Sequence, residues 1–407
     1  MNLTSPRSES EVEAYRRSLA GREVLVIGAA RSGMACLRRL AEAGARLRLG
    51  DSKTRDELGP AGDEAEALGA TVIERFERLE QAADADLVIS SPGVPPEHPA
   101  LVEARARGLE SFGTMEFGYR LCPGPILAIT GTNGKGTTCR FLAGMLERAG
   151  INCILAGNIG LPLADEVVRA RADTAVVLEV SSFQLETIVQ FRPRVATLLN
   201  VAPDHFDRHP TMGAYAAAKG RIFENQRPED FAVINNDESH ARQIAETSRA
   251  TALRVSLLTN ELEGLVAGGE LRVRLWGEVE RICPVSDIPL AGEHHLMNAL
   301  IASVMARLAG AAPAAIGEGI RAYRPPRHHM EVAGEVGGVV FINDTKATNP
   351  ASAVADMSAL QQPFVAIVGG RDKGADFAEL AALLRERPRA VILIGEAAER
   401  IAEAMGP

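Results

Sequence analysis

The sequence contains very little lysine. Of the 44 basic residues among 407, only five are lysine and the other 39 are arginine. Arginine therefore supplies nearly all of the ordinary surface charge. We expect the lysines to stand where a compact ammonium or a nucleophilic amine is needed. They are Lys53, Lys135, Lys219, Lys346 and Lys373.

Cysteine is also scarce. The five cysteines are scattered along the chain, and no two of them form a Cys-x-x-Cys pair. This pattern disfavours a disulfide framework and a zinc-binding motif, and it is typical of reduced thiols in a cytoplasmic protein.

Long apolar runs and excess positive charge are missing as well. No stretch reaches the length of a membrane span, and residues 1–21 contain no apolar signal core. The formal net charge of −9 disfavours a nucleic-acid scaffold and leaves small anionic ligands to be bound at local sites. We expect a cytoplasmic monomer that associates with neither membrane nor nucleic acid.

What the sequence does contain is a repeated pattern of strand, glycine turn and helix. It begins near residue 22, again near residue 124, and again after residue 330. Proline- and glycine-rich segments at 122–125 and 322–329 are typical of linkers. We predict an α/β fold of three domains. They are a Rossmann-like N-terminal domain (1–113), a central P-loop ATPase-type domain (114–325) and a Rossmann-like C-terminal domain (326–407).

The segment ILAITGTNGKGTTCRF (126–141) is similar to a phosphate-binding loop but departs from G-x-x-x-x-G-K-[ST]. Gly136 stands where a hydroxyl usually holds Mg²⁺. Because the loop joins a strand to a helix, its backbone N–H groups can face an anion. We expect Lys135 to contact the phosphates and Thr137 to replace Gly136 as metal ligand. The expected ATP-binding loop is Gly131, Thr132, Asn133, Gly134, Lys135, Gly136, Thr137 and Thr138.

Ionisable side chains follow other expected strands. Glu179 ends the strand AVVLEV, where a buried carboxylate either pairs with arginine or binds a cation. His205 follows another strand end beside Asp204, and Mg²⁺ accepts carboxylates and an occasional imidazole. Lys219 lies in an alanine-rich helix, either as a solvated lysine or as a functional amine.

The N-terminal βαβ unit is expected to bind an anion. Gly28 and Gly33 match the dinucleotide fingerprint, but Ala30 replaces its middle glycine. This is weak support for a dinucleotide and better support for some anion at the helix N-terminus. The later turns NDTKATNP (343–350) and GGRDKGADF (369–377) mix acid, base and glycine, and suit a nucleotide or an anionic substrate.

Taken together, these motifs resemble the Mur ligase family, the ATP-dependent amide ligases of peptidoglycan precursor synthesis. The resemblance covers nearly the whole chain, and SSFQLE (181–186) and NDTKATNP are typical of the branch that adds D-glutamate. It implies the substrates UDP-N-acetylmuramoyl-L-alanine (UDP-MurNAc-L-Ala) and D-glutamate, an acyl phosphate intermediate, ATP, and one or two Mg²⁺ ions.

The resemblance also implies residue roles. Catalytic residues would be Lys135, Lys219, His205 and Glu179. Metal ligands would be Thr137, Glu179, His205 and a carbamylated Lys219. Further ATP contacts would come from Asn298, Asp344 and Lys346. Substrate-binding residues would be Arg31, Ser32, Asp51, Ser52, Lys53, Ser91, Pro92, Gly93, Asn158, Ser181, Thr348 and Lys373.

The sequence departs from the family pattern in three places. His329 stands where an arginine usually reaches the nucleotide phosphates, although Arg327 is close enough in sequence to replace it. His295 stands where an adenine-contacting asparagine is common. The sequence stops at EAMGP, before a SPACASFD-like segment, so we expect an incomplete C-terminal domain.

Two alternatives stay open at this point. One is another ligase of the same superfamily, such as a folylpolyglutamate synthetase. The other is a truncated chain that binds UDP-sugar and ATP without completing the reaction.

Overall fold

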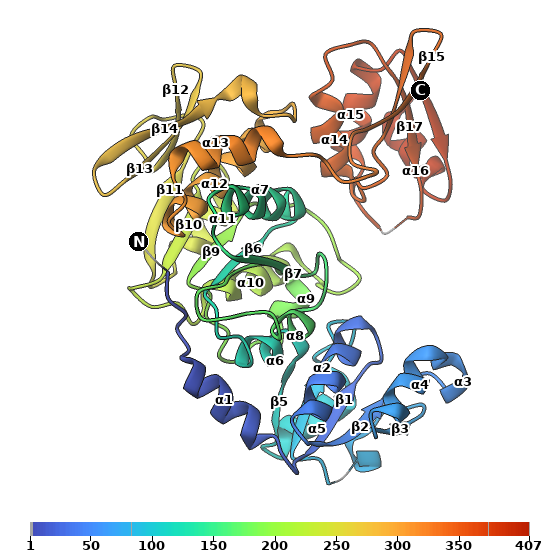
Figure 1. Ribbon diagram of the computed structural model, residues 1–407. Helices are drawn as coiled ribbons and strands as arrows, with labels where there is room; N and C mark the ends of the chain where they lie inside the picture. Colours follow the sequence, from blue (N-terminus) through green and yellow to red (C-terminus); the bar gives the residue numbers. More distant parts are fainter. Residues whose placement is uncertain (1–2, 83, 373, 407) are drawn as a thin grey trace.

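A computed structural model describes residues 3–82, 84–372 and 374–406. Figure 1 shows three α/β units, with the N-terminal unit at the lower right, the central unit in the middle and the C-terminal unit at the upper right. The predicted three-unit α/β fold class is therefore confirmed. Within the described ranges, no helix combines the length and apolar character needed to cross a bilayer. Lys373, expected in a substrate site, lies outside the described residues.

The N-terminal unit is a five-stranded parallel sheet in the order β3-β2-β1-β4-β5. The strands are β1 (Glu23–Ile27), β2 (Arg46–Gly50), β3 (Thr71–Ile73), β4 (Leu87–Ser90) and β5 (Glu110–Gly113). The helices are α1 (Glu9–Ser18), α2 (Arg31–Glu42), α3 (Arg55–Leu58), α4 (Pro60–Ala67), α5 (Pro99–Ala106) and the 3-10 helix η1 (Leu79–Ala82). The strand order reverses between β1 and β4, and such a reversal opens a ligand crevice at the carboxyl ends of the strands.

Gly33 allows α2 to pack directly onto the turn after β1. A Cβ atom at this position would overlap the carbonyl oxygen of Gly28 and lie 2.8 Å from Ser91 Oγ. We expect Gly33→Ala to lower the free energy of unfolding by roughly 1–3 kcal/mol, measured by urea denaturation, because the helix must move away. Gly93→Ala is the matched control, since no heavy atom lies within 4 Å of its added Cβ. Equal stability of the two variants would contradict this packing.

The central unit is a nine-stranded sheet in the order β14-β13-β12-β11-β10-β9-β6-β8-β7. The strands are β6 (Ile126–Thr130), β7 (Cys153–Gly157), β8 (Ala175–Glu179), β9 (Val195–Leu198), β10 (Phe231–Asn235), β11 (Thr251–Val255), β12 (Gly264–Ala267), β13 (Glu270–Leu275) and β14 (Glu278–Pro284). Pairing is parallel from β7 to β12 and antiparallel from β12 to β14.

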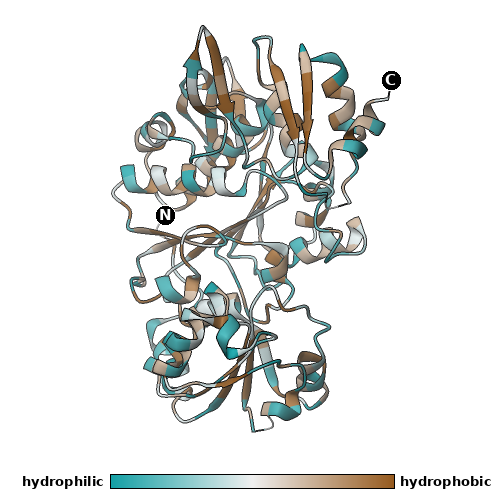
Figure 2. Ribbon diagram, turned by 90° about the vertical axis from the view of Figure 1, so that its right-hand side faces the viewer, coloured by the Kyte–Doolittle hydropathy of each residue, from teal (hydrophilic) through white to brown (hydrophobic). Residues whose placement is uncertain are grey.

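Helices cover both faces of this sheet. They are α6 (Thr114–Arg120), α7 (Lys135–Arg148), α8 (Leu163–Glu166), α9 (Ser182–Leu185), α10 (Met212–Gly220), η2 (Arg221–Phe223), α11 (Ser239–Ala245), η3 (Val285–Asp287), α12 (Glu293–Leu308) and α13 (Pro313–Ala322). Every residue of β6, β8 and β9 is buried, as expected for parallel strands that are covered on both sides. Figure 2 shows brown, apolar strands running through the molecule.

Alternate residues of these strands enter two different hydrophobic cores. Leu127 and Ile129 pack with α7, α12 and α13, whereas Ile126 and Ala128 join a core that continues into the N-terminal unit. Arg38 of α2 also binds Asp165 of α8 through two hydrogen bonds of 3.0 and 2.7 Å. The N-terminal and central units are therefore held together by both apolar packing and a bidentate ion pair.

The C-terminal unit has the smallest core. It contains the hairpin β15 (Glu331–Val336) and β16 (Val339–Asn343) and the parallel pair β17 (Val365–Gly369) and β18 (Ala390–Ile394). Its helices are α14 (Pro350–Ser358), α15 (Ala378–Glu386) and α16 (Ala398–Met405). Several strand residues stay outside the core, including Ile367, which is 64% exposed.

Candidate active site

The phosphate loop lies between β6 and α7, as the sequence predicts. Gly131 and Gly134 have φ values of +155° and +81°, which residues other than glycine rarely adopt. No side chain caps the N-terminus of α7, so the N–H groups of its first turn and the positive end of the helix dipole are left for a ligand. This geometry suits a phosphate group.

Asn200, which follows β9, fixes the shape of the loop. Its Oδ1 accepts hydrogen bonds from the backbone N–H groups of Thr132 (3.1 Å) and Asn133 (2.9 Å). Its Nδ2 donates to the Asn133 carbonyl at 3.2 Å. The side-chain amide of Asn200, just after the neighbouring strand, therefore fixes the conformation of the loop. The sequence did not predict this role.

Two lysines meet at one carbonyl oxygen of the loop. Lys135 Nζ donates to the carbonyls of Gly131 (2.9 Å) and Thr132 (2.8 Å), and Lys219 Nζ donates to the same Gly131 oxygen at 2.8 Å. Lys219 is 1% exposed, so the alternative of a solvated helix lysine is wrong. Burial and the charge of Lys135 hold the pKa of the Lys219 amine well below its ordinary value. Burial also lowers the pKa of Lys135. These amines are therefore easier to deprotonate than surface lysines.

Glu179 ends β8 next to the first turn of α7. Its Oε1 accepts a 2.8 Å hydrogen bond from Asn158 Nδ2, and among the described residues it forms no ion pair with arginine. A Cβ atom added to Gly136 would lie 3.3 Å from Glu179 Oε2. Gly136, the residue after Lys135, therefore faces the Glu179 carboxylate. A larger side chain at position 136 would crowd this carboxylate.

The proposed metal role of Thr137 stays a prediction. Thr137 is buried near Tyr323, whose phenol pKa is raised by burial. The hydroxyl of the next residue, Thr138, donates to the Gly134 carbonyl at 2.9 Å and is occupied by the helix itself.

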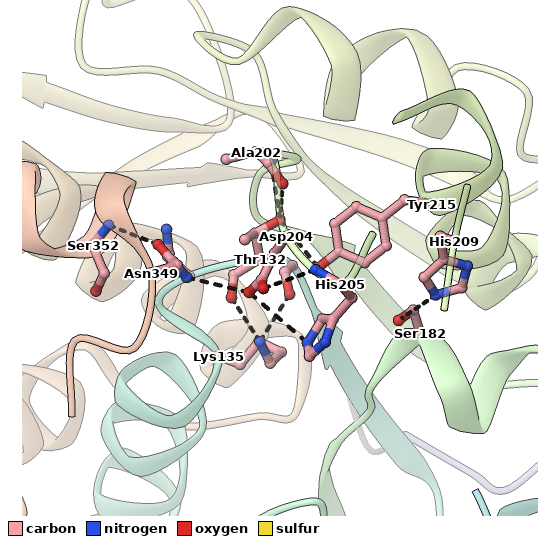
Figure 3. A network of polar contacts seen from close by, with 12 residues as sticks. Thr132, Lys135, Ser182, Ala202, Asp204, His205, His209, Tyr215, Asn349 and Ser352 are labelled. Atoms are coloured by element: carbon pink, nitrogen blue, oxygen red, sulfur yellow. Dashed lines mark hydrogen bonds and ion pairs between the residues drawn. The ribbon is translucent and has the colours of Figure 1, made fainter. Parts of the chain in front are cut away.

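Asp204 and His205 extend the site toward the C-terminal unit. Figure 3 shows Asn349, the N-cap residue of α14, on one side of Asp204 and His205 on the other. Asn349 Nδ2 donates to Asn133 Oδ1 at 3.0 Å and to Asp204 Oδ2 at 3.3 Å. His205 has φ +56°, a strained backbone for a residue other than glycine, and its imidazole is partly exposed. Such strain is commonest at functional sites.

Near His205 lies a second polar contact, formed by His209 and Ser182. His209 Nε2 lies 3.0 Å from Ser182 Oγ, and burial lowers the pKa of its imidazole. Ser181, expected to bind substrate, caps α9 by accepting a hydrogen bond from the Gln184 N–H at 3.3 Å. Its hydroxyl thus has a structural partner in this state.

The N-terminal crevice gathers most of the residues expected to bind the UDP substrate. Asp51 accepts hydrogen bonds from the N–H groups of Ala29 (2.7 Å) and Lys53 (3.0 Å), and Ser91 Oγ donates to the Gly28 carbonyl at 2.8 Å. No side chain caps the N-terminus of α2, which leaves its N–H groups for an anion. Ser32 begins this helix beside Arg31, whose guanidinium donates to the Gly160 carbonyl of the central unit. Ser52, Lys53 and Gly93 are exposed, and Pro92 is half-buried.

The residues expected to contact ATP from α12 and from the C-terminal unit differ in how far they are buried. Asn298 is buried against the loop, since a Cβ atom on Gly134 would lie 2.7 Å from Asn298 Oδ1. Asp344 Oδ1 accepts from the Met330 N–H at 3.0 Å, and burial together with the Asp356 charge raises the pKa of Asp344 to about 7. Lys346 and Thr348 are exposed. Arg327 points to solvent beside Glu331, so its sequence position does not bring it to the phosphate loop.

Comparison with known proteins agrees with this arrangement. Residues 22–113 match the MurD-like N-terminal domain of Mur ligases, residues 129–306 the Mur ligase middle domain, and residues 328–407 the Mur ligase glutamate ligase domain. The chain is 39% identical over 391 residues to the UDP-N-acetylmuramoylalanine–D-glutamate ligase of Pelotomaculum thermopropionicum, covering 94% of this chain and 84% of that protein.

Solved structures show the same fold at low sequence identity. MurF from Acinetobacter baumannii aligns with a TM-score of 0.64 at 17% identity, covering 98% of this chain and 88% of that chain. Escherichia coli FolC, in complex with DHPP and ADP, aligns with a TM-score of 0.53 at 23% identity, covering 72% of this chain and 80% of that one. The matched domains and the long, 39%-identical alignment show that this chain belongs to the Mur ligase family.

Proposed function

We propose that the protein is an ATP-dependent amide ligase that joins D-glutamate to UDP-MurNAc-L-Ala. The observation that carries the proposal is the meeting of Lys135 and Lys219 at the Gly131 carbonyl, beside the buried Glu179. A phosphate loop, a lysine that can neutralise phosphate charge and a carboxylate that can hold a metal ion are parts of a phosphoryl-transfer site. D-Glutamate as the acceptor is inferred from the names of the relatives.

The donor set fits the Mg²⁺ that the family implies. Glu179 supplies a carboxylate that has no arginine partner among the described residues, His205 supplies a partly exposed imidazole, and Thr137 supplies a hydroxyl. A carbamylated Lys219 would supply a further oxygen. When bound, Mg²⁺ would neutralise phosphate charge, and these four residues would hold one or two ions.

The reaction proceeds in two steps in this proposal. The alanyl carboxylate of the UDP substrate attacks the γ-phosphorus of ATP, ADP leaves, and an acyl phosphate forms. Lys135 Nζ and the loop N–H groups stabilise the charge on the transferred phosphoryl group. The D-glutamate amine then attacks the acyl carbon, loses a proton and expels phosphate to give the amide.

The crevice of the N-terminal unit would hold the uridine diphosphate. The free N–H groups at the start of α2 suit a diphosphate, and Asp51 and Ser91 keep the surrounding turns in place. Arg31 contacts Gly160 in the central unit, so it lies between the two units that the substrate must span. The predicted roles of Ser32, Ser52, Lys53, Pro92, Gly93, Asn158 and Thr348 belong to the same proposal.

Nucleotide contacts from α12 and from the C-terminal unit complete the proposal. Asn298 lies at the loop, whereas Asp344 and Lys346 belong to the C-terminal unit, which reaches the loop through Asn349. The proposal also includes a cytoplasmic monomer. The five cysteines, none of which forms a disulfide in the described ranges, support the cytoplasmic part of this proposal only.

Amine-dependent ADP formation tests the function directly. With UDP-MurNAc-L-Ala and ATP, we expect ADP and phosphate to form with D-glutamate and not with L-glutamate, L-lysine or no amine. ADP that forms at the same rate without any amine would mean that this chain activates the carboxylate but does not complete the ligation. No ADP with any amine would contradict the proposal. A folate-type ligase would instead require a pteroate substrate, and the MurD-like N-terminal match disfavours that alternative.

A further inference from the structure

Three histidines and two aspartates meet where the central and C-terminal units touch. His294 and His295 lie in the first turn of α12, Asp356 lies in α14, and His329 and Asp344 flank the hairpin β15–β16. The ligand atoms of His294, His295 and Asp356 all lie within 4.8 Å of one another, and so do those of His329, Asp344 and Asp356. Asp356 is thus common to both triads.

The two adjacent imidazoles turn toward the same carboxylate oxygen. His294 Nε2 lies 3.3 Å from Asp356 Oδ1, and His295 Nε2 lies 3.7 Å from it. Neither approach is a well-formed hydrogen bond, because His294 Nε2 is buried without a hydrogen-bond partner and 3.7 Å is too long. His295 is 3% exposed, and its Nδ1 also lacks a partner. Buried imidazole nitrogens left unpaired beside a carboxylate need an explanation.

Packing holds these rings in place. The His294 and His295 ring centroids are 3.9 Å apart, and the His295 and His329 centroids are 5.5 Å apart. A Cβ atom on Gly292 would lie 2.8 Å from the His294 ring, so glycine leaves room for the ring at the helix start. The cluster is therefore built by close packing of two units and is not a chance gathering of mobile surface side chains.

The residue types of the cluster suit a transition metal. Imidazole nitrogens and carboxylate oxygens are ligands that divalent ions such as Zn²⁺ and Co²⁺ bind well. Here three imidazoles lie around one buried acid, Asp356.

We propose that His294, His295 and Asp356, with His329 and Asp344 beside them, bind one divalent transition-metal ion such as Zn²⁺, which fastens α12 of the central unit to α14 of the C-terminal unit. This site is separate from the Glu179 and His205 donors at the phosphate loop. It does not depend on which amine the enzyme uses.

Cobalt binding to the chelator-treated full chain tests the site. We expect Co²⁺ to bind with a visible absorption band that reports nitrogen and oxygen ligands at the cluster, and Zn²⁺ to displace it. His295→Asn and Asp356→Asn should each weaken Co²⁺ binding by roughly 10–100-fold or more. Zn²⁺ should raise the melting temperature of the parent chain but not that of His295→Asn.

Two control variants separate this site from other metal-binding groups. His240→Asn removes an exposed histidine on α11 that lies outside the cluster and should leave Co²⁺ binding unchanged. Glu179→Gln should also keep the visible band, because it affects only the phosphate-loop donors. Failure to bind Co²⁺, or binding that Glu179→Gln abolishes and His295→Asn leaves intact, would overturn the proposal. An unchanged circular dichroism spectrum of His295→Asn would verify that this variant folds.

Discussion

Replacing Lys135 by alanine is expected to reduce D-glutamate-dependent ADP formation by roughly 10²–10³-fold or more, the loss typical of removing one charge-stabilising donor. In this structure Lys135 Nζ donates to the carbonyls of Gly131 and Thr132, so the ammonium is held at the phosphate loop. The measurement is steady-state ADP release at saturating ATP, together with single-turnover formation of the amide.

Arg140→Ala is the matched control for Lys135→Ala. Arg140 lies on the same helix, α7, but is exposed. Its removal should leave the rate within about twofold, since surface substitutions away from special features usually have small effects. Near-parental turnover in Lys135→Ala would mean that the loop does not use this amine on phosphate. The loop would then have to act through its N–H groups alone.

Replacing Lys219 by arginine is expected to reduce turnover by about 100-fold although the positive charge is kept, an effect of the size seen when the surroundings of a metal are disturbed. The proposed modification joins the uncharged amine to CO₂. A bond forms between Nζ and carbon, one proton leaves, and an N-carboxylate remains. Arginine does not form this product under the same conditions, so it cannot supply the carboxylate oxygen.

The surroundings of Lys219 favour this chemistry. The amine is buried, contacts the Tyr215 ring at 4.4 Å and lies near Lys135. Because burial and the Lys135 charge lower its pKa, a larger share of Lys219 is uncharged at neutral pH than of an exposed lysine. Raising the pH should therefore favour the carbamate, and this can be followed by the ¹³C signal of protein equilibrated with labelled bicarbonate.

Chemical rescue distinguishes a carbamate from a simple structural lysine. Lys219→Ala leaves space for a small acid, and added acetate or formate should restore part of the lost activity. The same acids should not rescue Lys135→Ala, since that lysine acts as a cation. Normal activity in Lys219→Arg, or the absence of any ¹³C carbamate signal, would remove the carbamate from the mechanism.

The sequence predicted the parts of the site that depend on local order. The phosphate loop lies between a strand and a helix, and Glu179 ends a buried strand. Both features were predictable because the periodicity of a strand or a helix depends on residues that are close in sequence. The crevice with Gly28, Asp51 and Ser91 also follows from parallel strands whose carboxyl ends share one edge. The predicted domain limits of 1–113, 114–325 and 326–407 stay predictions.

The sequence could not predict which distant side chains would hold these parts in place. Asn200 and Asp204 follow a strand like many other polar residues, and nothing in their neighbourhood distinguishes a loop support from a solvated turn. Asn349 is ordinary as an N-cap of α14, yet its amide also bonds to Asn133. These contacts depend on how the units pack against one another, and the local periodicity of the sequence does not predict that packing.

By itself, the sequence determined the order of strands, loops and helices, the family, and the chemical types of the residues at each strand end. Only the tertiary structure decided that Lys219 is buried and shares the Gly131 oxygen with Lys135, although 88 positions separate Lys219 from Gly131. It also decided that His295 meets Asp356 across two units. The physical reason is that local hydrogen bonding and hydrophobic patterning fix each element, whereas the desolvation and charge of a site come from elements brought together by burial of their apolar faces.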